Sequence, residues 1–236
     1  MKYKRILLKL SGESLMGSDG YGINYTAIHH FASEIQSVVN EGVQVGVVIG
    51  GGNIFRGLNG ASCGFDRRQG DYMGMLATII NSMALQSGLE ELGVKVKLMT
   101  SMAIEGIGEK VFYKKAISYL NQQYVVIFGG GTGNPFFTTD TGGALRAIEI
   151  QADLLLKGTR VDGVYTADPE KDPTAQRYEH ITYAEAYEKK LKIMDLTAFT
   201  ICQDNHLSLY VYNANIPGNL LKVLLGESVG TLCTNE

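Results

Sequence analysis

The feature that most constrains the fold of this chain is a glycine-rich stretch at 129–140 that directly follows the apolar run at 124–128. Glycines at the end of a buried strand let backbone N–H groups approach a ligand that side chains would otherwise block. Two more apolar runs end in the same way, at 6–10 before Ser11-Gly12 and at 43–49 before Gly50-Gly51-Gly52. One such loop alone is more typical of an ordinary strand-to-helix turn. Because parallel sheets bind ligands at the carboxyl ends of their strands, the three together predict one large site for two ligands.

Strand-like and helical patterns alternate along the chain. We expect strands at 6–10, 43–49, 94–99, 124–128, 154–157 and 209–212, and a first helix at roughly 24–40. This alternation is typical of an α/β protein in which helices cover both faces of a mainly parallel sheet, a three-layer α/β/α sandwich. Polar and charged residues become frequent after residue 150, so we expect one domain over 1–236, with a larger part at 1–150 and a smaller part at 151–236 that share one sheet.

A second helix is predicted to begin near Gly70, with Asp71 in its first turn. Apolar residues follow at helical spacing, namely Met73, Leu76, Ala77, Ile80 and Met83, and we expect the methionines among them to fill the core. Asp71 has two interpretations. It is either a carboxylate favoured by the helix dipole or a site residue, because it lies where the chain leaves the glycine-rich loop at 50–52. Further along, 161–165 is predicted to form a tight turn between two short extended pieces.

Composition excludes several classes of protein. With 236 residues, 45% of them hydrophobic, the chain can bury a sizeable core. A formal net charge of −3 lacks the basic excess of a general nucleic-acid or anionic-membrane binder. The three cysteines have no Cys-x-x-Cys spacing, which argues against a disulfide framework or a zinc site. The first apolar run is far too short for a signal sequence, so we expect a soluble, cytoplasmic protein with no membrane or nucleic-acid partner.

The motifs narrow the phosphate chemistry. A Walker A loop needs a Gly-Lys pair, which the chain lacks, and the dinucleotide fingerprint fails because Phe55 stands where its third glycine belongs. Lys9 ends the first predicted strand just before Ser11-Gly12. Such a lysine is commonly a surface residue at a strand edge, but here it lies beside backbone N–H groups suited to a phosphate. Arg56 supplies a second cation, and phosphoryl transfer needs little more than positioning, cations and a metal.

Five blocks of sequence carry a resemblance to a known family: Lys-Leu-Ser-Gly-Glu at 9–13, the stretch at 47–57, Gly-Asn-Pro-Phe-Phe-Thr-Thr-Asp at 133–140, the stretch at 161–169, and Lys-Ile-Met-Asp at 192–195. Together they resemble the bacterial UMP kinases of the amino acid kinase superfamily over essentially the whole chain. The block at 133–140 is close to specific for that family, whereas 9–13 is shared with acetylglutamate and aspartate kinases. The resemblance implies the amino acid kinase fold and transfer of the γ-phosphoryl group of MgATP to UMP, giving UDP and ADP in pyrimidine nucleotide synthesis.

The resemblance also implies residues for each nucleotide. Those at the ATP site would be Lys9, Leu10, Ser11, Gly12, Gly52, Arg56, Thr159, Tyr165 and Asp168. Those at the UMP site would be Gly51, Asp71, Thr132, Gly133, Asn134, Pro135, Phe136, Phe137, Thr138 and Thr139. Asp71 would accept from the ribose hydroxyls, and the donors of 132–139 would suit the α-phosphate and the uracil edge. The two phenylalanines would shape the pocket, with packing in the core as an equal alternative for each ring.

By the same resemblance, catalytic roles would fall to Lys9, Arg56, Asp140, Lys157 and Asp195. Because the transition state is itself anionic, the two carboxylates make sense only by orienting lysines or a hydrated Mg²⁺, and direct metal ligands stay open. Lys157 would be a second cationic stabiliser, and an exposed lysine at a strand end is a nearly equal alternative.

Regulation is implied by the resemblance alone. The segment Gly17, Ser18, Asp19, Gly20, Tyr21 and Gly22 aligns with a stretch that the family associates with activation by GTP. On physical grounds it is a surface loop. The family is typically a homohexamer that GTP activates and UTP inhibits, so we expect a homo-oligomer with these two effectors.

Two other functions stay open. A superfamily kinase that phosphorylates a carboxylate, such as acetylglutamate or carbamate kinase, would need cations at its acceptor site, whereas 132–139 offers hydroxyls, an amide and aromatic rings. A nucleotide-sensing protein without turnover would have no need of Lys9, Arg56, Asp140 and Asp195. Both observations favour a nucleotide kinase.

Overall fold

A computed structural model gives the structure of the chain and describes residues 1–55, 64, 66–169 and 171–236. In that part, nine strands form one sheet in the order β4-β3-β5-β2-β1-β6-β8-β9-β7. The strands are β1 (Arg5–Leu10), β2 (Gln44–Ile49), β3 (Val96–Thr100), β4 (Glu109–Lys110), β5 (Val125–Gly129), β6 (Leu154–Thr159), β7 (His180–Thr182), β8 (Leu209–Asn213) and β9 (Gly230–Thr234). Neighbouring strands are parallel except for β8 and β9, which confirms the mainly parallel sheet. Pairing of β1 with both β2 and β6 joins the two parts of the chain in one sheet, as predicted.

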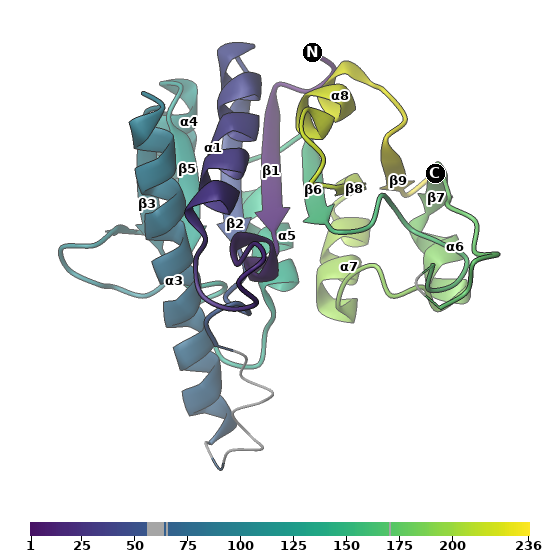
Figure 1. Cartoon of the computed structure of the whole chain (residues 1–236), viewed down its shortest axis with the longest axis horizontal. Coiled ribbons are helices and arrows are strands. Elements are labelled where there is room, and N and C mark those ends of the chain that lie inside the picture. The colour runs from purple at the N-terminus through teal and green to yellow at the C-terminus, as the bar shows by residue number, and fades with distance from the viewer. Residues whose placement is uncertain (56–63, 65, 170) are drawn as a thin grey trace.

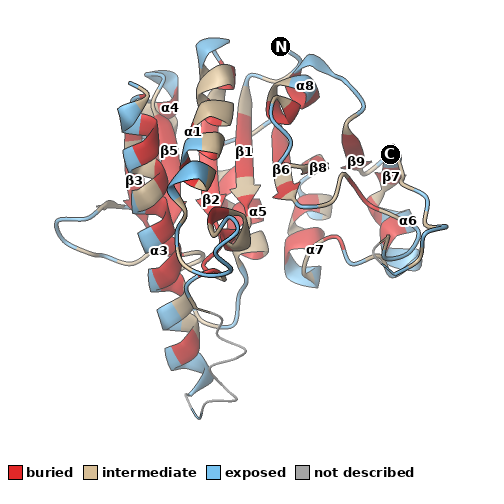
Figure 2. Cartoon of the chain, viewed as in Figure 1, coloured by how far each residue is buried: buried red, intermediate tan, exposed pale blue. Residues whose placement is uncertain are grey.

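Helices cover both faces of this sheet (Figure 1). They are α1 (Tyr25–Asn40), α3 (Arg67–Glu91), α4 (Tyr113–Asn121), α5 (Thr139–Glu149), α6 (Tyr183–Glu188), α7 (Leu196–Asp204) and α8 (Asn219–Leu225), with a short 3₁₀ helix, η1 (Gly12–Leu15). Alternate residues of β1 enter two separate cores: Ile6 and Leu8 pack on the side of α1, α3 and α8, and Leu7 packs on the side of α4, α5 and α7. The buried strands between two helical layers confirm the three-layer α/β/α sandwich (Figure 2).

Three strands lie outside the predicted set. The strands β4 and β7 have two and three residues, too few for a period-2 pattern, and both contain charged or polar side chains. The strand β9 pairs with β8 in the antiparallel direction and with β7 in the parallel direction. The predicted turn at 161–165 leads into a single antiparallel bridge between Tyr165 and Arg177.

The helix α3 differs from its prediction in two ways. It begins at Arg67, with Asp66 as its N-cap, so Asp71 lies in the second turn and not in the first. The helix dipole therefore explains Asp71 less well than a role in the site does, because that effect fades beyond the first turn.

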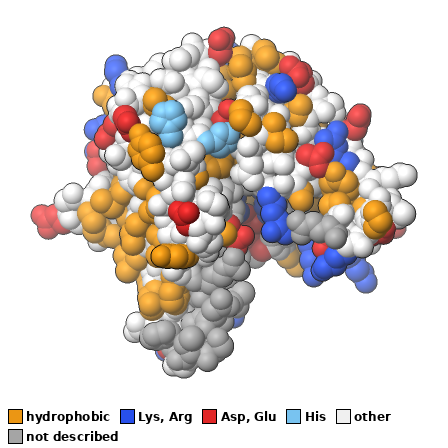
Figure 3. All heavy atoms as spheres, in the orientation of Figure 1, with side chains coloured by type: hydrophobic (Ala, Val, Ile, Leu, Met, Phe, Trp, Pro, Cys, Tyr) orange, Lys and Arg blue, Asp and Glu red, His pale blue; other side chains and the backbone are white. Residues whose placement is uncertain are grey.

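Most of the apolar stripe of α3 is also exposed, so the prediction that its methionines pack in the core is wrong; Ala77, which is 2% exposed, is the one member of the stripe that is buried. Tyr72, Met73, Leu76, Ile80 and Met83 are each 36–47% exposed. The face that packs inward combines apolar residues with small and polar ones; its buried residues are Gly70, Met75, Ala77, Thr78, Ile79, Asn81, Ser82, Leu85, Gly88 and Leu89. The N-terminal half of α3 extends past the carboxyl ends of the strands, so the sheet does not cover its apolar side (Figures 1 and 3).

Candidate active site

The three glycine-rich strand ends meet at one edge of the sheet, as predicted. The strands β5, β2 and β1 are adjacent, and the Gly50 amide donates to the Leu10 carbonyl at 3.0 Å. A Cβ atom on Gly12 would lie 2.5 Å from the Gly50 oxygen, and one on Gly51 would lie 2.8 Å from the Gly74 oxygen. Glycine is required at both positions because backbones approach too closely for any side chain.

Two lysines and one carboxylate form the centre of this edge. Lys9 on β1 and Lys157 on β6 are register partners, so their side chains point to the same face, toward α5. Asp140 in the first turn of α5 lies between them: Oδ1 is 2.6 Å from Lys9 Nζ, and Oδ2 is 2.7 Å from Lys157 Nζ. The three side chains are 12–16% exposed. Neither lysine is an exposed residue at a strand edge, and the cluster retains one net positive charge.

The cluster shifts the pKa values of its members. Burial alone would raise the pKa of Asp140, but the charges of Lys9 and Lys157 outweigh it and lower that pKa below its usual range. Burial lowers the pKa of Lys157, and the charge of Asp140 opposes this effect without cancelling it. Lys157 Nζ also donates to the Ile193 carbonyl at 2.6 Å. The carboxylate is thus held ionised between the two cations.

Asp195 lies beside this cluster as the N-cap of α7. Its Oδ1 accepts from the Ala198 amide at 3.0 Å, and the hydroxyls of Thr138 and Thr141 donate to its carboxylate. Thr138 is itself the N-cap of α5, where its hydroxyl accepts from the Asp140 amide at 3.1 Å. Asp195 therefore joins the beginnings of α5 and α7 and fixes the backbone that carries Asp140.

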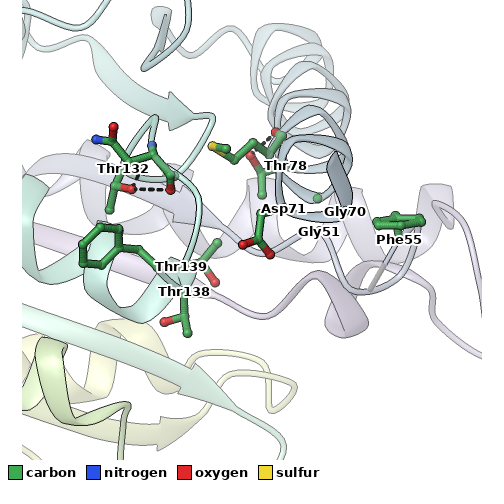
Figure 4. Close-up of a pocket in the computed structure, with 13 residues that line it drawn as sticks. Gly51, Phe55, Gly70, Asp71, Thr78, Thr132, Thr138 and Thr139 are labelled. Atoms are coloured by element: carbon green, nitrogen blue, oxygen red, sulfur yellow. Dashed lines mark hydrogen bonds between the residues drawn. The ribbon is translucent and has the colours of Figure 1, made fainter. Parts of the chain in front are cut away.

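The first of two flanking pockets lies between α3 and the segment 131–139 (Figure 4). Its lining includes predicted acceptor residues, namely Gly51, Asp71, Thr132, Asn134, Phe137, Thr138 and Thr139, and also Phe55, Gly70, Gly74, Met75, Thr78 and Gly131. Asp71 crosses from α3 to this segment, where its Oδ2 accepts from the Phe136 amide at 2.8 Å. The predicted Gly133, Pro135 and Phe136 belong to the same segment but do not line the pocket.

The two phenylalanines do not pack in the core. Phe136 is 58% exposed and Phe137 is 50% exposed, which removes the alternative of core packing for both rings. Phe136 has a φ of 74°, a left-handed conformation that is costly for a bulky side chain. Its ring centroid lies 5.2 Å from the Arg67 guanidinium, a cation–π arrangement.

The second pocket, of about 570 Å³, opens on the other side of Lys157. Thr159, Tyr165 and Asp168, predicted for the adenosine end of ATP, all line it. So do Lys189 and Lys190, which no motif had indicated, and Lys192, which begins the block at 192–195 but had no role assigned to it. The Tyr165 hydroxyl donates to Asp162 Oδ1 at 2.6 Å, and this hydrogen bond raises the pKa of Tyr165.

The remaining predicted residues have separate places. Leu10 is buried at the end of β1, and the Ser11 hydroxyl caps η1 by accepting from the Glu13 amide. Gly52 directly follows Gly51 in the loop after β2. Arg56 lies outside the described residues. The loop at 17–22 is exposed except at Gly22, whose amide donates to the Asn53 carbonyl at 2.9 Å.

The donor set does not fit a metal ion held by the protein. Asp140 is enclosed by two ammonium groups, and Asp195 already accepts from two hydroxyls and an amide. Among the described residues, no group of three His, Cys, Asp or Glu side chains could hold a metal. A Mg²⁺ ion that arrives on a nucleotide would be coordinated by phosphate oxygens and water, as is usual for this ion.

Several contributors were missed by the sequence analysis. Thr78 donates to Met75 O and accepts from the Gly130 amide at 2.8 Å, which holds the glycine-rich stretch after β5 against α3. Asn53 and Asn81 are buried and hydrogen-bonded to each other. On α3, the apolar pattern gave no indication that Thr78 and Asn81 are part of the site. Of the three residues, only Asn53 lies in one of the sequence blocks that indicated a functional site. No helix in the described part is long and apolar enough to cross a membrane.

Comparisons with known proteins agree with this geometry. The amino acid kinase family matches residues 4–213. The curated uridylate kinase of Porphyromonas gingivalis is 60% identical over 99% of this chain and 98% of its own length, and that of Parabacteroides distasonis is 60% identical over 99% of both. The solved UMP kinase of Bacillus anthracis has a TM-score of 0.97 at 39% identity and covers 100% of this chain and 98% of that one. The UMP kinase of Ureaplasma parvum has a TM-score of 0.94 at 36% identity, with 99% and 100% covered. These relatives confirm the resemblance that the motifs carried.

Proposed function

From the premise that the chain belongs to the amino acid kinase family, we propose that it is a UMP kinase, which transfers the γ-phosphoryl group of MgATP to UMP and releases UDP and ADP. The observation that carries this proposal is the Lys9–Asp140–Lys157 cluster between two pockets. Thr139, next to Asp140 in the chain, lines one pocket, and Lys157 lines the other. Two phosphorylated ligands bound on either side would place their reacting phosphates at a site with one net positive charge.

The cations carry the chemistry in this proposal. An oxygen of the UMP phosphate bonds to the γ-phosphorus as the bond from that phosphorus to the bridging oxygen of ATP breaks. Lys9 and Lys157 stabilise the negative charge on the transferring group and on the leaving ADP. Asp140 orients the two ammonium groups, and Asp195 is a positioning residue for Asp140 through Thr138 and Thr141. Arg56 is assigned to the transferring group from the motif alone.

The acceptor pocket favours a ribonucleotide over an amino acid. Among the described residues that line it, the charged side chain is the carboxylate of Asp71, and no cation is present to hold the carboxylate of acetylglutamate or aspartate. That same carboxylate accepts from hydroxyls, so it suits the ribose of UMP. The backbone N–H groups and hydroxyls of 132–139 would hold the α-phosphate and the uracil edge. The larger second pocket, with Thr159, Tyr165 and Asp168, would hold adenosine.

Regulation and assembly complete the proposal. The exposed apolar face of α3, formed by Tyr72, Met73, Leu76, Ile80 and Met83, supports packing against a second copy of the chain and hence a homo-oligomer, for which we propose the hexamer of the family. We assign GTP as an activator acting through 17–22 and UTP as an inhibitor. We place the enzyme in the cytoplasm, where its nucleotide substrates are found.

The test is ADP release by the purified protein with MgATP and, in parallel, UMP, CMP, dUMP, acetylglutamate or aspartate. We expect turnover mainly with UMP. Turnover only with acetylglutamate or aspartate would show that the protein is one of the carboxylate kinases of the family. Nucleotide binding without turnover would favour a nucleotide-sensing protein.

A further inference from the structure

Asn53 and Asn81 form a closed pair in the interior of the protein, 5% and 0% exposed. Asn81 Nδ2 donates to Asn53 Oδ1 at 2.7 Å, and Asn53 Nδ2 donates to Asn81 Oδ1 at 3.0 Å. The second hydrogen of each amide goes to a backbone carbonyl: Asn81 donates to Gly50 O at 2.7 Å, and Asn53 donates to Gly22 O at 2.6 Å. All four amide hydrogens are therefore used, which is the full donor capacity of two asparagines.

The pair bonds to two glycine-containing segments and packs against a third. Gly50 begins the loop after β2, and Gly22 ends the loop at 17–22 and returns its own amide to the Asn53 carbonyl at 2.9 Å. Gly12, after β1, packs so closely that a Cβ atom there would lie 2.6 Å from Asn53 Oδ1 and 2.5 Å from Gly50 O. The pair is thus the point where the helix α3, the two phosphate loops and the surface loop are connected.

A role in packing alone does not account for this arrangement. Asparagine is an unfavourable residue inside a helix, and burying an amide costs free energy that an apolar side chain of the same size would not cost. The neighbouring Ser82 shows the ordinary solution for a buried polar residue of α3: its hydroxyl bonds to Thr78 O, one turn back in the same helix. Asn81 instead directs both donors away from its own helix, to the Gly50 carbonyl and to Asn53.

We propose that Asn53 and Asn81 are positioning residues that fix the spacing between the loop that binds ATP and the loop that binds UMP. The proposal rests on the proposed function in assigning Gly12 to ATP and Gly51 to UMP. The Gly50 carbonyl lies against Gly12 on one side and adjoins Gly51 in the chain on the other. Its hydrogen bond from Asn81 therefore sets how far apart the two phosphates lie when both nucleotides are bound. Transfer is sensitive to this distance because a displacement of about 1 Å can cost about 100-fold in rate. Binding of either nucleotide alone does not depend on it.

The same pair also makes the spacing depend on the surface loop. A change in the position of Gly22 reaches Asn53 through two hydrogen bonds, and Asn53 is joined by two more to Asn81. The pair is consequently one route by which a displacement of 17–22 would alter the rate of transfer and leave the affinity for each substrate unchanged.

The experiment compares Asn81→Ala, Asn53→Ala and the double variant with Ser82→Ala as the matched control, which loses a buried hydrogen bond inside α3 only. We expect kcat to fall at least tenfold in both single variants, with the Kd of UMP and of ATP, measured separately by calorimetry, changed less than threefold. The double variant should be no slower than the slower single variant, because the two side chains act as one unit. The proposal would be overturned by any of three results: a fall in kcat in the double variant equal to the product of the falls in the single variants, a weakening of UMP and ATP binding as large as the fall in kcat, or a similar fall in kcat in Ser82→Ala. If Asn81→Ala does not fold, Asn81→Leu, an uncharged side chain of similar size that removes both donors, takes its place.

Hydrogen exchange supplies a readout that does not require turnover. In Asn81→Ala we expect faster amide exchange in both 11–22 and 50–55, and in Ser82→Ala we expect unchanged exchange in both segments. Exchange at 11–22 that does not respond to Asn81→Ala would refute the connection. If the two variants show these exchange rates but the wild-type protein releases no ADP with UMP, the proposed function is refuted and the connection between the loops still stands.

Discussion

Replacing Asp140 with asparagine tests the central cluster most directly. The substitution keeps the shape of the side chain but removes the charge that lies 2.6 Å from Lys9 Nζ and 2.7 Å from Lys157 Nζ. At an effective dielectric constant of about 20 and about 3 Å between charges, each pair has a gross attraction of about 5 kcal/mol. The desolvation of three buried ions offsets most of this attraction. We therefore expect the substitution to lower the unfolding free energy by about 3 kcal/mol. This value is at the lower end of the range for breaking a buried ion pair, because the asparagine amide still accepts one hydrogen bond.

Urea unfolding measures this cost as a fall in the midpoint at unchanged slope. The sign of the pH dependence is fixed by the lowered pKa of Asp140. Its stabilisation is present above the usual value of 3.8 and is lost as the pH falls through the lower folded value, so the difference between wild type and variant should shrink below pH 3.8. In steady-state assays, kcat should fall about 100-fold because the lysines lose their orientation. The Kd of ATP should stay the same or decrease, because a carboxylate near the phosphates has been removed. A variant with wild-type stability at neutral pH, or one whose defect lies wholly in the Kd of ATP, would refute the reasoning.

Four further substitutions, one of them read through a pH profile, extend the test. Lys9→Ala should keep the fold and the affinity for UMP while transfer is lost; full activity in coupled assays would remove Lys9 from the mechanism. Because burial lowers the pKa of Lys157, kcat of the wild type should begin to decline with rising pH before the pH reaches 10.5, the usual pKa of a lysine. Lys157→Arg keeps its charge, so it should move that decline to higher pH even if its maximum rate is lower. Asp71→Asn should raise KM for UMP by about 10-fold to 100-fold, as expected for the loss of a charge-assisted hydrogen bond. The variant should also prefer UMP over dUMP less strongly than the wild type does. If the ratio of kcat/KM for UMP to kcat/KM for dUMP is unchanged, Asp71 does not contact the ribose. Phe136→Gly should change the unfolding free energy by less than about 1 kcal/mol, because relief of the left-handed backbone offsets the added freedom of the unfolded chain. A larger loss of stability in urea unfolding would show that the contact between the Phe136 ring and the Arg67 guanidinium stabilises the fold by more than this amount.

Much of the site was predictable because it depends on local sequence. Glycines that end buried strands are visible in the chain, and the order of parallel strands brings those ends to one edge. Lys9 lies one residue before the end of such a strand, so its place near the site followed from the same pattern, whereas Lys157 was placed by the family resemblance, with an exposed lysine at a strand end as a nearly equal alternative. That they are register partners with Asp140 between them depends on strand pairing, which periodicity does not specify.

The parts that failed depend on contacts distant in sequence. The apolar stripe of α3 has helical spacing whether it faces a core or solvent, and only the position of α3 relative to the sheet distinguishes the two. Asn81 had no signal in the sequence: it is a polar residue outside any motif, and it is fully buried because its partners lie at Gly50 and Asn53. Asp195 was recognised from its block, but its function as an N-cap that accepts from Thr138 and Thr141 required the packing of α7 on α5.

The segment 132–140 links acceptor binding to the orientation of the cations. At one end, Thr132 and Asn134 line the acceptor pocket; at the other, Thr138 caps α5 and Asp140 holds the two lysines. A ligand whose binding displaces this segment therefore also displaces the N-cap of α5, and with it the carboxylate between Lys9 and Lys157. Asp195 limits this movement from α7 by accepting from Thr138. Since the lysines have no other shared carboxylate in the described residues, their orientation toward a donor phosphate depends on how the acceptor is bound. This arrangement would favour transfer to UMP over hydrolysis, because the cations reach their working positions only when the acceptor segment is in place.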